Sequence, residues 1–152
     1  EVVENRKASF SVAIVLGEII LIILIIAFVP YRKIDWDAYM SQQVSGFLNG
    51  ERDYYKLEGD TGPLVYPAGF LYLFSAIQYV TGGHVYPAQI LFGVLYVVNH
   101  AMVLFIYWKT DKLPWWALGL LSLSRPIHSY FVRHLCNDCF VMTLFHASLI
   151  SF

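Results

Sequence analysis

The chain has 152 residues, of which 58% are hydrophobic and only 14% are charged, and its mean hydropathy is +0.57. A soluble domain carries about 25% charged residues, so this chain has too little polar surface to solvate a compact globule and is predicted to be an integral membrane protein. The net charge of −1 argues against a nucleic-acid-binding protein, and the two cysteines argue against a disulfide-rich secreted scaffold.

The first apolar segment, residues 10–29, is predicted to span the membrane as a helix. Its 20 residues match a hydrocarbon core of roughly 30 Å at about 1.5 Å per residue, and Pro30 ends it. A signal peptide would have an apolar core of about 7–15 residues followed by small residues, so an anchor is favoured. Glu18 lies inside this segment and is expected to face protein or a polar cavity, either as a structural or as a functional carboxyl.

A polar loop follows, over about residues 31–86. Residues 36–48 predict an amphipathic helix on the membrane surface, with Gln43 on its polar side. Its apolar stripe consists of Trp36, Met40, Val44, Phe47 and Leu48. Asp35 falls at the N-cap position, and Asn49 and Gly50 end the helix in a turn. The glycine-rich stretch at 59–63 has turn chemistry but not the pattern of a phosphate-binding P-loop.

Further apolar segments follow this loop. Residues 64–80 number 17, at the bottom of the spanning range, so they are expected either to span or to lie at the interface or re-enter. Residues 87–108 and 113–132 are predicted spans, and a fourth span from residue 139 is expected to be incomplete at 152. We therefore expect the N-terminal part of one larger polytopic domain.

The role of residues 64–80 decides the topology. If this segment spans, Asp35 and Asp138 lie on opposite sides of the membrane; if it is interfacial, they lie on the same side and could share a site. The interfacial interpretation also places Arg6-Lys7 and Lys109/Lys112 on one face, as the positive-inside rule prefers, and is therefore favoured.

Four motifs carry a family resemblance: IDWDAYM from residue 34, NGERDY from 49, GDTGPLVYPAGF from 59 and HSYFVRHLCND from 128. They resemble the dolichyl-phosphate-mannose-dependent α-1,3-mannosyltransferases of N-glycan assembly, which belong to the GT-C superfamily. The resemblance implies an all-α GT-C bundle with a long lumenal first loop, in a multi-pass protein of the endoplasmic reticulum membrane. It also implies an inverting enzyme that needs no metal or other cofactor and moves mannose from dolichyl phosphate mannose to Man5GlcNAc2-PP-dolichol.

The resemblance also assigns roles to residues. An acid just beyond the first helix acts as catalytic base in this superfamily, and here that position is Asp35. The substrate-binding candidates are Asp37, Asp60, Tyr66, Arg125, His128, Arg133, His134, Asn137 and Asp138. The family pattern LRLFND reads VRHLCND in this chain, which leaves open which cation meets a phosphate.

Each candidate has a structural alternative. Asp35 is compatible with helix capping, and Asn137 and Asp138 with capping the next helix. The cationic candidates are compatible with interfacial snorkelling. Cys136-x-x-Cys139 lacks the further ligands of a zinc site and is interpreted as a pair of small apolar residues. His100 is expected to form a hydrogen bond between helices.

Three other functions stay open. A transporter or channel subunit would explain the intramembrane polar groups, but not an acid-bearing loop beside the first helix. A noncatalytic subunit of a membrane complex would explain the aromatic content. A GT-C glycosyltransferase with another polyprenyl-phosphate-sugar donor is the nearest alternative.

Overall fold

The structure is a computed structural model that describes residues 2–31, 34–110, 112–122 and 128–152. It is mostly helical, with one short hairpin in these ranges. In chain order the elements are α1 (Val2–Phe28), α2 (Ile34–Asp37), η1 (Ala38–Val44), α3 (Ser45–Leu48), η2 (Tyr54–Lys56), β1 (Glu58–Gly59), β2 (Gly62–Pro63), α4 (Ala68–Thr81), α5 (Val85–Thr110), α6 (Ala117–Ser122), η3 (Ser129–Arg133) and α8 (Asp138–Ser151).

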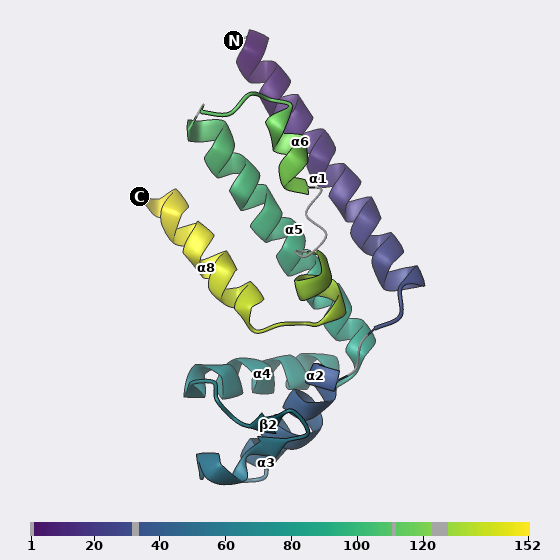
Figure 1. The fold of residues 1–152 in the computed structure, drawn as a ribbon, viewed down its shortest axis with the longest axis vertical. Helices are drawn as coiled ribbons and strands as arrows, with labels where there is room; N and C mark the ends of the chain where they lie inside the picture. The colour runs from purple at the N-terminus through teal and green to yellow at the C-terminus, as the bar shows by residue number, and fades with distance from the viewer. Residues whose placement is uncertain (1, 32–33, 111, 123–127) are drawn as a thin grey trace.

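Two long helices, α1 and α5, pack against each other and run in opposite directions (Figure 1). Their apolar stretches, Arg6–Phe28 and Val85–Thr110, are long enough to cross a membrane and contain 18-residue windows with mean hydropathies of 2.9 and 2.0. They overlap the spans predicted over 10–29 and 87–108. Many apolar side chains of α1 remain exposed, as contact with lipid requires.

In the region predicted as a third span, residues 113–132, the structure describes residues 113–122 and 128–132. α6 (Ala117–Ser122) follows a turn in which the Ala117 N–H donates to the Pro114 carbonyl at 3.0 Å. η3 is a π-helix of five residues that packs against α5. α8 (Asp138–Ser151) then runs beside α5.

Residues 34–48 form a continuous helical stretch, with α2 leading into the π-helix η1 and then into α3. Trp36, Met40 and Val44 are buried as the stripe predicts, but they pack into the protein core. These three side chains therefore contact protein, and the placement of the helix on the membrane surface stays a prediction. Gln43, expected on the polar side, is also buried, because it lies seven residues after Trp36 and three after Met40, which places it on the same face of the helix.

The observed boundaries of this helical stretch agree in part with those predicted from the sequence. α2 begins at Ile34, so Asp35 lies in the first turn and not at the N-cap. The stretch ends after Leu48, and Gly50 has a φ of 101°, as the predicted Asn49-Gly50 turn requires. Residues 49 and 50 therefore do end the helix.

α4 is shorter than the 17-residue segment that the sequence suggested. It has 14 residues, begins after Pro67 and ends at Gly82, whose φ of 62° is left-handed. Figure 1 shows α4 lying across the end of the bundle where α1 finishes and α5 begins. This placement favours the interfacial interpretation of the segment.

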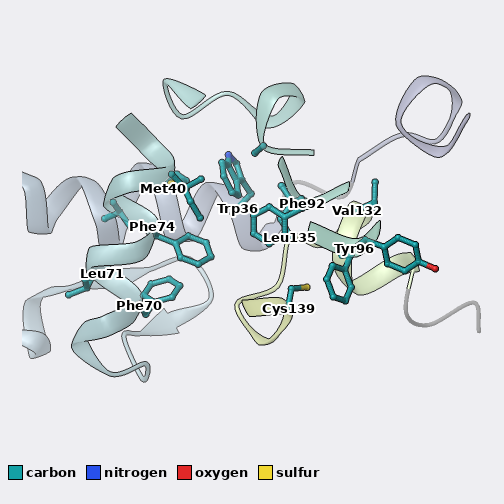
Figure 2. Close-up of a cluster of buried hydrophobic side chains, with 14 of the residues drawn as sticks. Trp36, Met40, Phe70, Leu71, Phe74, Phe92, Tyr96, Val132, Leu135 and Cys139 are labelled. Atoms are coloured by element: carbon teal, nitrogen blue, oxygen red, sulfur yellow. The ribbon is translucent and has the colours of Figure 1, made fainter. Parts of the chain in front are cut away.

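One buried hydrophobic cluster connects the loop to the bundle. On the loop side it contains Trp36, Phe70 and Phe74, and on the bundle side Phe92 and Leu135. Figure 2 shows Trp36 beside Phe92 and Leu135, where the loop helices meet the bundle. The acid-bearing end of the loop is therefore attached to the same core as the segment that precedes α8.

Candidate active site

The first part of the site is the N-terminal end of α2. Asp35 is the second residue of α2, and Asp37 is exposed two residues later. Between them, Trp36 is 1% exposed and its Nε1–H donates to the Gly83 carbonyl at 3.1 Å. This bond ties the acidic pair to the turn that joins α4 to α5.

The second part is the hairpin of β1 and β2, in which Gly59 pairs with Gly62. Asp60 is exposed at its tip, and its backbone N–H donates to Gln42 Oε1 at 2.6 Å. Gln43 Nε2 donates to the Gly62 carbonyl at 3.4 Å. Two neighbouring side chains of η1 thus hold the hairpin that carries Asp60.

Tyr66 belongs to an aromatic group between the hairpin and α4. Its ring stacks on Phe70 at 4.8 Å, and its hydroxyl lies 3.3 Å from the Tyr39 hydroxyl. Tyr66 is half-buried, so much of its surface serves packing. A substrate-binding role for Tyr66 stays a prediction.

His128 lies in the bundle interior and not at a surface. Its Nε2 is 2.8 Å from Glu18 Oε2 and 3.0 Å from the Tyr96 hydroxyl, which itself donates to Glu18 Oε2 at 2.8 Å. All three residues are buried. The expectation that Glu18 faces protein is confirmed, and these contacts give His128 a role in joining α1, α5 and the segment before η3.

Arg133 and His134 follow at the end of η3, where both are half-buried. The next residue, Leu135, is fully buried and has a φ of 53°, in the left-handed region that side chains seldom adopt. The Cys136 N–H closes this turn by donating to the Tyr130 carbonyl at 3.2 Å. A strained turn therefore sets the position of the two cationic candidates.

Asn137 and Asp138 come at the start of α8. The Asn137 side chain makes no capping hydrogen bond, so the capping alternative is not supported for this residue. Asp138 is exposed and lines a partly open cavity of about 470 Å³ between α5 and α8. Tyr96, His100 and His146 also line it.

His100 and the two cysteines were also interpreted from the sequence. His100 Nε2 lies 3.0 Å from Ser122 Oγ, which confirms the predicted bond between helices. Cys136 and Cys139 are not in a disulfide, and Cys139 is buried. In the described ranges no group of three or more His, Cys, Asp and Glu side chains could hold a metal ion.

Two acids of the loop, Glu51 and Asp53, accept hydrogen bonds from backbone N–H groups of their own turn. The backbone N–H of Asp53, and secondarily that of Arg52, hold the pKa of the exposed Glu51 carboxyl below its ordinary value of 4.5. The Asp53 carboxylate in turn accepts the Tyr55 N–H at 3.1 Å. These two acids stabilise their own turn.

The candidates therefore form two groups on either side of the shared core. Asp35, Asp37, Asp60 and Tyr66 belong to the loop, and His128, Arg133, His134, Asn137 and Asp138 belong to the bundle side. Arg125 lies outside the described residues.

Three residues that shape this arrangement were not among the candidates. Tyr96 could have been found as a polar partner for Glu18, because an intramembrane carboxyl needs one. The sequence around Gln42 and Leu135 does not indicate their roles. The hydrogen bond of Gln42 is to Asp60, 18 residues further along the chain, and leucine does not indicate a left-handed turn.

Comparison with known proteins gives a consistent result. Residues 12–152 match the family model described as ALG3 protein. The chain is 70% identical over 149 residues to the Dol-P-Man:Man(5)GlcNAc(2)-PP-Dol alpha-1,3-mannosyltransferase of Arabidopsis thaliana, covering 98% of this chain and 34% of that protein. It is 48% identical over 124 residues to the enzyme of the same name from Mus musculus, covering 80% of this chain and 28% of that protein.

A third relative is the Drosophila melanogaster protein Dolichyl-P-Man:Man5GlcNAc2-PP-dolichol alpha-1,3-mannosyltransferase Alg3, at 45% identity over 139 residues, 90% of this chain and 27% of that protein. No solved structure matches the chain. The chain thus spans about a third of the length of the curated relatives it matches. Because the family model covers nearly all of it, this chain belongs to the ALG3 protein family.

Proposed function

We propose that the protein containing this chain transfers mannose from dolichyl phosphate mannose to Man5GlcNAc2-PP-dolichol in α-1,3 linkage. The observation that carries the proposal is the 70% identity, over 149 residues, to a relative named for this reaction. Further support comes from an acid at the end of a candidate span, where a lipid-carried substrate presents its headgroup. The protein then acts in the endoplasmic reticulum membrane, with its site on the lumenal side.

In this mechanism Asp35 is the general base. The donor carries a good leaving group, dolichyl phosphate, on the anomeric carbon of mannose. Asp35 removes the proton of an acceptor hydroxyl while the hydroxyl oxygen attacks that carbon from the face opposite the leaving phosphate. This inversion turns a β-linked donor into an α-linked product. The proton goes to the carboxylate, and the electron pair of the broken bond leaves with the phosphate.

The departing phosphate needs positive or hydrogen-bonding partners. Arg133 and His134 are the cationic candidates whose placement supports this role, because both lie in the strained turn that packs on the same core as Trp36. Arg125 stays a candidate by resemblance. His128 is assigned a positioning role instead, since Glu18 and Tyr96 occupy its Nε2.

Asp35→Asn in the full-length enzyme tests the base. The amide keeps the side-chain size but cannot take the proton, and loss of a general base typically lowers the rate about 10²–10⁴-fold. Mannose transfer with purified enzyme and both lipid substrates is the measurement, and the protein should accumulate normally.

Asp37→Asn is the matched control, because this exposed acid lies two residues further along the same helix. It should keep most of the activity. Near wild-type transfer by Asp35→Asn would remove Asp35 from the mechanism and make Asp37 the next acid to test.

A GT-C enzyme with a different polyprenyl-phosphate-sugar donor would share this chemistry. Donor competition separates the two: only dolichyl phosphate mannose should support transfer to the Man5 acceptor. Transfer from dolichyl phosphate glucose at equal efficiency would contradict the proposed donor.

A further inference from the structure

The tip of the β1–β2 hairpin presents polar groups that the fold does not use. Asp60 and Thr61 are exposed there, between two glycines. Within the part of the chain that the structure describes, the Asp60 carboxylate and the Thr61 hydroxyl have no intramolecular partner. The carboxylates of Glu51 and Asp53, by contrast, both accept backbone N–H groups of their own turn.

The backbone under this tip is held firmly. Gln42 accepts the Asp60 N–H at 2.6 Å, and Gln43 donates to the Gly62 carbonyl at 3.4 Å. A Cβ on Gly59 would lie 2.9 Å from Gln42 Oε1 and 3.1 Å from the Ala38 carbonyl oxygen, so the hairpin approaches η1 closely. A fixed backbone that carries polar side chains without intramolecular partners is the arrangement of a preorganised binding site.

The hairpin also lies in the part of the molecule away from the bundle. Figure 1 shows α1, α5 and α8 on one side of α4, and the hairpin on the other. With α4 at the membrane boundary, as the interfacial interpretation places it, the hairpin faces the aqueous side, where the sugar part of a lipid-linked substrate extends. Gln42 lies seven residues from Asp35 along one helical stretch, which corresponds to about 10 Å at about 1.5 Å per residue.

We propose that Asp60 and Thr61 bind hydroxyl groups of the acceptor glycan, and that Gln42 and Gln43 are positioning residues that hold this contact at a fixed spacing from Asp35. The inference rests on the proposed function. A carboxylate accepts hydrogen bonds from sugar hydroxyls, and a threonine hydroxyl can donate or accept. The negative charge of Asp60 disfavours the donor phosphate, so the ligand is the neutral glycan.

The experiment measures initial rates of the full-length enzyme with varied Man5GlcNAc2-PP-dolichol and, separately, varied dolichyl phosphate mannose. Asp60→Ala should raise the acceptor KM about 10–100-fold, the range for a lost hydrogen bond to a charged group. The donor KM and kcat should stay within about 2-fold. Thr61→Val should raise the acceptor KM less, since a neutral hydrogen bond is weaker.

Glu58→Ala is the matched control, because Glu58 is an exposed carboxylate on the same hairpin, one residue before Gly59. It should leave both KM values unchanged. Gln42→Leu should raise the acceptor KM by releasing the Asp60 N–H, and Gln42→Glu should restore it, because its carboxylate still accepts that bond.

An unchanged acceptor KM in Asp60→Ala, or an equal rise in the donor KM, would overturn the inference while wild-type transfer upholds the proposed function. Absence of mannose transfer by the wild-type enzyme would overturn the proposed function and the inference together. The two failures are therefore distinguishable in one set of assays.

Discussion

Trp36 connects the acidic motif to the rest of the molecule. Its ring packs against Phe74 of α4 at 6.4 Å, and its Nε1–H donates to the Gly83 carbonyl. The sequence predicts correctly that Trp36 belongs to an apolar face, but it does not reveal what covers that face. The partners come from 38 and 47 residues further along the chain, and a local 3–4 spacing holds no information about them.

Trp36→Ala is expected to destabilise the folded protein by about 3–5 kcal/mol, because a large buried side chain leaves a cavity. Trp36→Phe should cost less, since it keeps most of the packing and loses the hydrogen bond. Thermal unfolding in detergent measures both. Trp116→Ala is the control, at a 57% exposed tryptophan, and should change the unfolding temperature little. Equal shifts for Trp36→Ala and Trp116→Ala would contradict the buried anchor.

At the scale of elements, the positions of the long apolar helices can be predicted from the sequence, but the helix type within the loop cannot. The long helices follow from hydrophobic length alone, and α1 and α5 overlap the predicted spans closely. The π-helical turn of η1 has no such signature. The burial of Gln43 does follow the helical period, seven residues after Trp36 and three after Met40, so its assignment to the polar side was wrong.

Because α4 lies across the end of the bundle, residues 51 and 137 should lie on the same side of the membrane. In a background with Cys136 and Cys139 replaced by alanine, Glu51→Cys and Asn137→Cys should react with an impermeant thiol reagent from the same side. Lys112→Cys, in the turn after α5, should react only from the other side. Labelling of residues 51 and 137 from opposite sides would show that α4 spans the membrane.

At the scale of the whole molecule, buried polar contacts between distant segments hold the bundle in register. Glu18 meets Tyr96 and His128, which are 78 and 110 residues away along the chain. Asn99 Oδ1 lies 2.8 Å from His146 Nδ1 and links α5 to α8 in the same way. That Glu18 needs a partner follows from the cost of an intramembrane carboxyl, but which residues supply it depends on the packing of three segments.

Glu18→Ala is expected to destabilise the bundle by about 3–5 kcal/mol, because it leaves the Tyr96 and His128 groups buried without their shared acceptor. Glu18→Gln should cost less, since it keeps one oxygen that can accept a hydrogen bond. The yield of monodisperse protein and the unfolding temperature in detergent measure the effect. Leu16→Ala, at an exposed position of the same helix, is the control. Wild-type stability of Glu18→Ala would show that the network contributes nothing to the assembly.

The left-handed backbone of Leu135 has a consequence for the order of folding. A leucine gains nothing from this conformation by itself; its side chain fills the core that Trp36 and Phe92 complete, and the Cys136 N–H closes the turn. During synthesis the turn before α8 therefore has no reason to form until the loop helices have already collapsed around Trp36. The N-terminal loop thus acts as a template for the chain that emerges later, and the cationic pair before Leu135 reaches its place only on a loop that has folded correctly.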